Sequence, residues 1–432
     1  MSPEIIGLIG IFALLLLFLL GVPVGFSMGI VGVVGFTVLS DSHSALVLMA
    51  QDTFDTLSSY PLSVIPMFIL MGSFAYASGI SQRLYKTSYN WFGHLRGGLT
   101  IATVIACSGF AAICGSTAAT AATMGKIALP EMKKYGYNDR LSTGTVASAG
   151  TLGILIPPST VLIIYGILTE ESIGDLFLAA ILPGALLSLL FVLTVIVICR
   201  LHPEWGPPGP ATSIKEKLVS LTDILEAFLL FGLVLGGLFL GWFSPTQAGS
   251  IGATGALAIG FFRRQLTWDK FLSCARDGLR TSCMVLFIFV GGTIFSHFLA
   301  ITNIPFALAD WVSTLPLSPM SIMVVIIGIY FVGGFFMDGM ALIVVTIPIF
   351  YPIVTQMGFD SLWFGVIIVI VAEMGVITPP VGANVFIIKG IAPHIPMNTI
   401  FRGIFPFLYA LMALTALMLF FPELATYIPR SL

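Results

Sequence analysis

The chain has 432 residues, of which 57% are hydrophobic and 9% are charged, and its formal net charge is −2. Soluble domains average about 25% charged residues, so this composition excludes an ordinary soluble domain and predicts an all-α polytopic membrane protein. The near-neutral charge gives no indication of a nucleic-acid partner. The five cysteines show no metal-ligand spacing, and we interpret them as small apolar residues.

Apolar runs of membrane-spanning length follow one another along the first half of the chain, each close to the roughly 20 residues that a spanning helix needs. The predicted spans are 5–20, 24–39, 61–78 and 176–198. The first run has an acidic flank, Glu4, and no basic segment, so we interpret it as a span rather than a signal peptide. The mixed stretch 41–59 and the polar, aromatic stretch 81–96 are predicted to lie along the membrane interface.

Two features interrupt the apolar pattern between residues 97 and 168. The segment 97–130 has the small, polar centre Gly115-Ser116-Thr117, so we predict a re-entrant hairpin with its tip there, and the next span, 143–168, is broken at Pro157-Pro158. Unpaired backbone at membrane depth is tolerated only where it is buried in protein or lines a cavity, and such interruptions point to a transporter binding site. The alternatives are close helix packing through small residues and a plain proline kink.

The same features recur 222 residues further along the chain. Ser116 matches Asp338, and the backbone-breaking residues Pro130, Gly136, Gly153, Pro157 and Pro158 match Pro352, Gly358, Gly375, Pro379 and Pro380. We therefore predict an internal repeat whose halves are joined by a Pro/Gly-rich linker, 200–222. The second half then comprises spans 224–241, 247–262 and 282–300, a hairpin 319–352, a broken span 362–388 and a last span 398–421.

The placement of Lys and Arg predicts that this repeat is inverted, because basic residues collect in cytoplasmic loops. Basic residues flank the first hairpin on both sides, as at Arg96 and Lys133, whereas none lies near Asp310 or Asp360, which flank the second. The first hairpin is therefore predicted to enter from the cytoplasm and the second from the other side. This topology places the N-terminus outside the cytoplasm.

Three ionisable residues are predicted at membrane depth, where charges are expensive and mark ion paths. Asp338 lies at the second tip, so we favour a cation-binding role over a helix cap at Gly339. For Glu373, a functional role and pairing within a polar cavity both remain open. We predict that His297 is a buried, satisfied residue rather than a proton relay.

The chain contains no GxxxxGK[ST], HExxH or GxSxG motif. It is therefore predicted not to be an enzyme, and transport energy must come from an ion gradient or a separate ATPase. Hydrolysis within the membrane is the enzymatic alternative. It needs a nucleophile with a base, and Ser116 with His297 is the pair that the sequence offers.

The chain resembles the large membrane subunit of tripartite ATP-independent periplasmic (TRAP) transporters. The resemblance rests on the runs AAICGSTAATAATMGKIALPEMKKYGY, GILIPPSTVLIIYG, FSPTQAG, FFMDG, FGV and TPPVGANVFIIKGIA, and it covers nearly the whole chain. The chain departs from the usual pattern at Leu141-Ser142, where an aromatic–alanine pair is common. The resemblance implies an elevator-type transporter in the bacterial inner membrane that couples uptake of an organic acid to sodium.

The resemblance also implies which residues form the sites. One sodium ion would be held by Ser116, Gly150, Gly153 and Pro157, and a second by Gly334, Asp338, Thr378 and Gly382. The substrate would lie between the tips and the proline breaks, near Gly115, Ser116, Thr117, Pro158, Ser159, Gly339, Pro380 and Asn384.

The implied domains and partners follow the same family pattern. Residues 1–96 and 223–318 would form a scaffold, and 97–199 and 319–432 would form the moving transport domain. A small four-span membrane subunit and a periplasmic solute-binding protein would complete the system, which would carry a C4-dicarboxylate, sialic acid or another organic acid. The alternatives are a stand-alone sodium–dicarboxylate or citrate symporter with similar hairpins, and a membrane scaffold or channel.

Overall fold

The computed structural model describes residues 2–431, and within them the regular elements are all helical. The first half contains α1 (Pro3–Leu19), α2 (Val24–Leu39), α3 (Ser42–Ser58), η1 (Pro61–Ser63), α4 (Val64–Ala77), α5 (Ile80–Phe92), α6 (Gly98–Cys114), α7 (Thr117–Lys134), α8 (Asp139–Ala149), α9 (Leu152–Leu155), α10 (Thr160–Thr169) and α11 (Ile173–Leu201). The second half contains η2 (Pro203–Trp205), α12 (Ile214–Phe239), α13 (Pro245–Phe262), α14 (Trp268–Ile301), α15 (Ile304–Thr314), α16 (Pro319–Gly333), α17 (Gly339–Gln356), α18 (Ser361–Ile377), α19 (Ala383–Ile391), α20 (Met397–Phe420) and α21 (Glu423–Ser431).

Several of these helices are long and apolar enough to cross a bilayer. Six helical segments between residues 2 and 431 meet that criterion, or seven if α3 and the η1–α4 segment, which are bent by 57°, count as one span. Large apolar side chains such as Phe12, Leu19 and Phe228 are exposed on the outer surface, as contact with lipid requires. The predicted all-helical, polytopic class is therefore confirmed.

Several helices extend beyond the apolar spans that the sequence predicted. Helix α12 begins ten residues before the predicted span, because Ser213 and Glu216 form a capping box at its start. Helix α14 begins at Trp268 rather than Ser282, with the Thr267 side chain as its N-cap. The final helix α21 lies beyond the last predicted span. Helical structure continues here through polar residues that a search for apolar runs leaves out.

The helix breaks fall at corresponding positions of the two halves. Helices α7 and α17 begin at Thr117 and Gly339, 222 residues apart, and α8 and α18 begin at Asp139 and Ser361 with the same spacing. The backbone leaves the helical conformation between α9 and α10 and between α18 and α19. Each of these two gaps contains a Pro-Pro pair, and both pairs are joined by a cis peptide bond.

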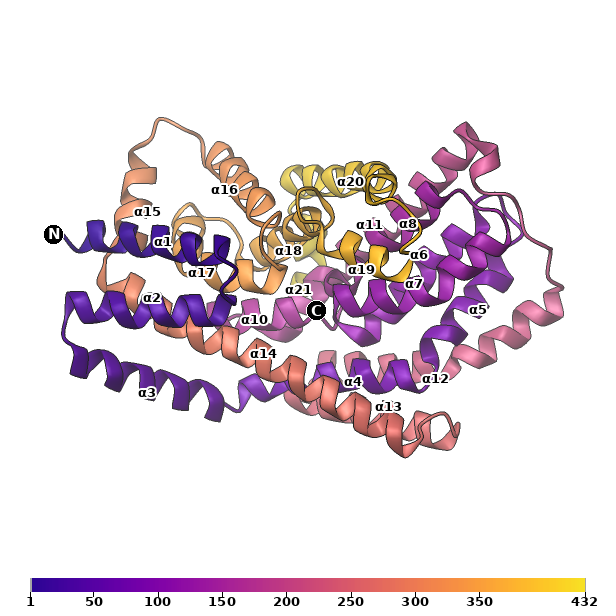
Figure 1. Cartoon of the computed structure of the whole chain (residues 1–432), viewed down its shortest axis with the longest axis horizontal. Helices are drawn as coiled ribbons and strands as arrows, with labels where there is room; N and C mark the ends of the chain where they lie inside the picture. The colour runs from indigo at the N-terminus through magenta and orange to yellow at the C-terminus, as the bar shows by residue number, and fades with distance from the viewer. Residues whose placement is uncertain (1, 432) are drawn as a thin grey trace.

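Two groups of helices pack along the length of the molecule. Helix α14 runs beside α2, α3 and α4, with α13 against α4, along one side in Figure 1. The hairpins α6–α7 and α16–α17 lie with the broken helices and α20 on the other side. Helices α2 and α14 approach closely through glycines: a Cβ on Gly291 would lie 2.1 Å from the Gly25 carbonyl oxygen.

We predict that Gly291→Ala lowers the melting temperature of the detergent-solubilised protein by several degrees, because a methyl group cannot fit against the Gly25 backbone. Overpacking of this kind costs about 1–3 kcal/mol. The matched control is Gly236→Ala on α12, where a Cβ meets no atom within 4 Å and alanine favours the helix. Thermal unfolding followed by tryptophan fluorescence compares the two variants, and equal melting temperatures would contradict the assigned contact.

Candidate functional site

The first hairpin tip packs directly on the first broken helix. Gly115 has φ +62°, and Ser116 caps α7, its Oγ accepting a hydrogen bond from the Ala119 N–H at 3.4 Å. Thr160 Oγ1, at the start of α10, donates to the Gly115 carbonyl at 2.9 Å. On the other side of the break, a Cβ on Gly153 would lie 2.5 Å from the Ser116 carbonyl oxygen. The structure therefore brings tip and break together, as the sequence predicted.

The second tip has the same relation to its own broken helix. A Cβ on Gly375 would lie 2.4 Å from the Cα of Gly334, so the two backbones touch. Asp338 caps α17, its Oδ2 accepting from the Met340 N–H at 3.3 Å. Thr378 closes the end of α18 by donating from Oγ1 to the Met374 carbonyl at 2.5 Å. The capping role considered for Asp338 is thus present in the structure, and its carboxylate is still exposed toward the cavity described next.

A cavity of about 1100 Å³ connects the two tips to the polar ends of the neighbouring helices. Its inner end is lined by Ser116, Thr117, Ile154, Asp338, Met340 and Glu373. Its outer end is lined by Gly79, Gln82, Arg83, Arg263, Gln265 and Lys270. Helices α7, α17 and α10 all begin at its inner end. Helix N-termini carry positive partial charge and free N–H groups, so this end of the cavity can hold an anion.

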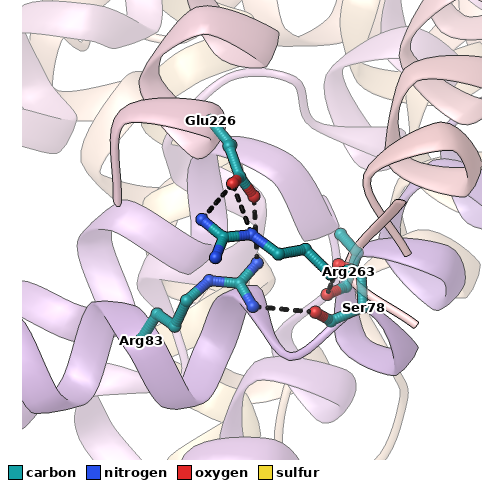
Figure 2. A network of polar contacts seen from close by, with 5 residues as sticks. Ser78, Arg83, Glu226 and Arg263 are labelled. Carbon is teal, nitrogen blue, oxygen red and sulfur yellow. Dashed lines mark hydrogen bonds and ion pairs between the residues drawn. The ribbon is translucent and has the colours of Figure 1, made fainter. Parts of the chain in front are cut away.

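A charged network stands at the outer end of the cavity (Figure 2). Glu226 of α12 lies between two guanidinium groups, with its Oε2 3.5 Å from Arg83 and its Oε1 accepting from Arg263 Nε at 2.6 Å. Arg83 also donates to the Ser78 carbonyl at 3.0 Å. The hydrogen bond and the charge of Glu226 raise the pKa of Arg263. The network joins α5, α12 and the end of α13 around the mouth.

Five buried oxygen atoms without hydrogen-bond partners in the described chain lie on α7, α8, α18 and α19. Thr117 Oγ1, Thr120 Oγ1, Ser148 Oγ, Glu373 Oε2 and Asn384 Oδ1 have no hydrogen-bond partner among the described residues. A Cβ added to Gly153 would lie 2.7 Å from Thr120 Oγ1. A Cβ added to Gly150 would lie 3.2 Å from the Asn384 amide nitrogen. Hydroxyl, carboxylate and carbonyl oxygens are the ligands that a sodium ion takes at unwound helices. Oxygens of these types lie beside the first predicted sodium site, at Gly150 and Gly153, and Asp338 of the second site supplies a carboxylate at the cavity wall.

Some residues predicted to bind substrate lie outside the cavity wall. Ser116 and Thr117 line the cavity as predicted, whereas the residues absent from the lining are Gly115, Pro158, Ser159, Gly339, Pro380 and Asn384. Two of them have other bonds: Ser159 Oγ caps α10 by accepting from the Leu162 N–H, and Asn384 donates to the Ala147 carbonyl at 3.0 Å. Of the other predicted positions, Gly382 has φ +62° and starts α19. Pro157 lies within the first break.

Sequence reasoning did not identify the face of α14 that lines the cavity. Lys270, Ser273, Asp277, Thr281 and Met284 line it at spacings of three or four residues, which place them on one side of a helix. The spacing is visible in the sequence, but it falls partly in a stretch interpreted as a loop. Ile154 and Met340 were also missed, because nothing in an apolar side chain distinguishes a cavity wall from a core.

The prediction for His297 needs correction. Its side chain is 48% exposed rather than buried, and its Nδ1 lies 2.8 Å from Oδ2 of Asp52 on α3. The histidine is satisfied, but by a contact between α14 and α3 at the surface. It is absent from the cavity lining that contains Ser116, so the structure does not assemble the nucleophile–base pair considered for an enzyme.

An all-helical membrane protein whose broken helices meet at a polar cavity has the architecture of a secondary transporter. Comparison with known families identifies which one. The family "Tripartite ATP-independent periplasmic transporter, DctM component" matches residues 11–424, and the chain belongs to that family as a large membrane subunit.

The sequence is similar to those of TRAP transporter permease proteins over almost their full length. The C4-dicarboxylate TRAP transporter large permease protein DctM of Pseudomonas aeruginosa is 36% identical, with 94% of each chain covered. The sialic acid TRAP transporter large permease protein SiaM of Vibrio cholerae is 29% identical, with 97% of each covered. The fold is similar to that of the Alcanivorax borkumensis YdaH transporter, with a TM-score of 0.65, 15% identity and 89% of each chain covered.

Proposed function

We propose that this protein is the large membrane subunit of a sodium-coupled uptake system for an organic acid in the bacterial inner membrane. The observation that carries the proposal is the convergence of two capped hairpin tips and their broken helices on one cavity. Relatives of the chain are named for C4-dicarboxylates, sialic acid, isethionate and ectoine. We infer a substrate of the same chemical class, an organic acid.

The charges of the site suit an anionic substrate that is bound together with sodium ions. The N-termini of α7, α10 and α17 face the inner end of the cavity and favour an anionic group. One sodium ion would lie at Ser116, Gly150, Gly153 and Pro157, close to Thr120, whose buried hydroxyl has no partner among the described residues. The other would lie at Gly334, Asp338, Thr378 and Gly382, where a carboxylate supplies negative charge. Each ion would offset part of the charge of the bound acid.

We infer that the two halves are an inverted repeat working by an elevator mechanism. The 222-residue spacing of helix starts supports the repeat, and the one-sided placement of Lys and Arg supports the inversion. Residues 97–199 and 319–432 would move as one transport domain against the scaffold 1–96 and 223–318. Under this topology the N-terminus is periplasmic, and the basic mouth of the cavity, with Arg83 and Lys270, opens to the cytoplasm.

The proposed system needs two partners, a small four-span membrane subunit and a periplasmic solute-binding protein that delivers the acid. Membership of the tripartite family supports this assembly. A stand-alone symporter of similar hairpin fold is the less favoured alternative.

The direct test is uptake into liposomes that contain this chain and its small subunit. Succinate, sialic acid, isethionate and ectoine are supplied in turn, with an inward sodium gradient and the purified binding protein. We expect accumulation of one acid without ATP, and only with both the gradient and the binding protein. Full uptake without the binding protein would favour the stand-alone symporter, and uptake without the gradient would contradict sodium coupling.

The inverted topology predicts that the two hairpins open to opposite sides of the membrane. Single cysteines at Lys133, after the first hairpin, and at exposed Asp310, before the second, are introduced into a cysteine-free background. A membrane-impermeant maleimide should label the Asp310 position in intact cells, and the Lys133 position only after the cytoplasmic side is opened. Labelling of both positions from one side would contradict the inversion.

If Asp338 holds sodium, Asp338→Asn should raise the sodium concentration needed for half-maximal uptake by about tenfold or more, since the charge is lost. Asn caps helices about as well as Asp, so the variant should fold normally. Asp360→Asn is the matched control, because Asp360 also caps a helix, accepting from the Trp363 N–H at 3.0 Å. Unchanged sodium dependence in a folded Asp338→Asn variant would leave Asp338 with the capping role alone.

A further inference from the structure

Glu373 is the residue at the centre of the site whose role neither the fold nor the proposed sodium sites explain. It lies in the last turns of α18, before the second break, and only 2% of it is exposed. It reaches the wall of the cavity, and its Oε1 lies 3.7 Å from the Cβ position of Gly339 at the start of α17. Its polar neighbours are Thr117 of the first tip and Asp338 of the second. Glu373 therefore stands between the two tips.

No cation accompanies this carboxyl group in the part of the chain that the structure describes. Its Oε2 makes no hydrogen bond within residues 2–431, and it belongs to none of the ion pairs found there. The basic residues of the same cavity have other partners: Arg83 and Arg263 contact Glu226, and Lys270 donates to the Gln265 carbonyl. The charged neighbour of Glu373 is Asp338, which carries the same sign.

The helices around α18 supply no counter-charge either. Their hydroxyl groups are bonded elsewhere, since Tyr165 donates to the Ser361 carbonyl and Tyr330 contacts Thr346. Lys389 of α19 donates to the carbonyls of Pro393 and Ile395. The other titratable side chains on elements packed against α18 are absent from the cavity lining; they are Asp175, Cys199 and Arg200 of α11, Tyr351 of α17, Arg402 and Tyr409 of α20, and Glu423, Tyr427 and Arg430 of α21.

A buried carboxyl group without a basic side chain to pair with is stable when it is neutral; the sodium ion proposed at Asp338 would offset the charge of Asp338 itself. A protonated carboxyl group has an O–H donor, and a neutral acid can donate a hydrogen bond to an anion. An ionised Glu373 would instead repel an acid bound between the tips. We propose that Glu373 keeps its proton and donates it from Oε2 in a hydrogen bond to an anionic oxygen of the transported organic acid. This assignment rests on the proposed function.

Thr117 lies near Glu373 as a second unpaired polar group, whereas Thr151, the residue at the matching position of the first half, is bonded elsewhere. Thr117 Oγ1 is likewise buried and unpaired among the described residues, so it supplies a second donor from the other tip. Thr151, 222 residues earlier, donates from Oγ1 to the Ser148 carbonyl at 2.6 Å and does not line the cavity. At this repeat position the second half alone has a carboxyl donor, and this makes Glu373 a specificity-determining residue for anionic substrates.

The test measures sodium-driven uptake by the complete system with three substitutions at position 373, using the acid among succinate, sialic acid, isethionate and ectoine that the unchanged chain accumulates. Glu373→Gln keeps the size and an uncharged donor, so its KM for that acid should stay within about twofold of the unchanged chain. Glu373→Leu removes the donor and should raise KM by about tenfold or more, in line with loss of a hydrogen bond to a charged group. Glu373→Asp keeps the ionisable group but shortens it, and should also raise KM. Asp55→Asn, at an exposed position of α3 outside the cavity, is the control for expression and assembly.

Each outcome decides between chemical roles. Loss of uptake in Glu373→Gln with activity kept in Glu373→Asp would overturn the proposal, because it would mean that the ionised form is needed. An unchanged KM in a folded Glu373→Leu variant would also overturn it, because no hydrogen bond would then be made. If the unchanged chain takes up no succinate, sialic acid, isethionate or ectoine, the proposed substrate class fails first, and the role of Glu373 fails with it.

Discussion

The constraint on which this structure depends is the need to satisfy backbone polar groups inside a bilayer. An unpaired N–H or C=O in hydrocarbon costs several kcal/mol, yet two hairpin tips and two broken helices of this chain place helix ends at the centre of the fold. They can do so because each end rests on another: Thr160 bonds to the Gly115 carbonyl, Ser116 and Asp338 cap the returning arms, and Gly334 touches Gly375. The breaks therefore satisfy part of one another's backbone groups where they meet.

The same constraint explains the chemistry of the site. Opening a helix frees N–H groups at one end and carbonyl groups at the other, so a meeting point of broken helices offers donors to an anion and oxygens to a cation. Polar side chains at such a point have little water to bond with. Those left without partners in the described chain, such as Thr120 and Glu373, are therefore the groups to which the proposed ion and substrate would bind.

The sequence predicted the helix breaks, because each break is caused by the residues at the break itself. Pro157-Pro158, Pro379-Pro380 and the Gly-Ser-Thr tip break helices through their own backbone chemistry, and the structure places a break at each. The full lengths of α12 and α14 were not predicted, because they continue through polar residues that only caps and tertiary contacts hold in a helix. The pairing of Glu226 with Arg83 joins positions 143 residues apart in the chain, which no local pattern encodes. The same is true of the contact between His297 and Asp52.

Helix α14 is a continuous rod of 34 residues without an internal proline. At about 1.5 Å per residue it is about 50 Å long, well beyond the roughly 30 Å of a hydrocarbon core, so it either tilts or projects into water. Its first half carries Lys270 and Asp277 at the cavity mouth, and its second half meets α2 at Gly291 and Val344 of α17 at Gly292. Sharp kinks in a helix usually need a proline or a similar interruption. A displacement of the first half of α14 at the mouth would therefore be carried along the helix to its contact with the second hairpin at Gly292.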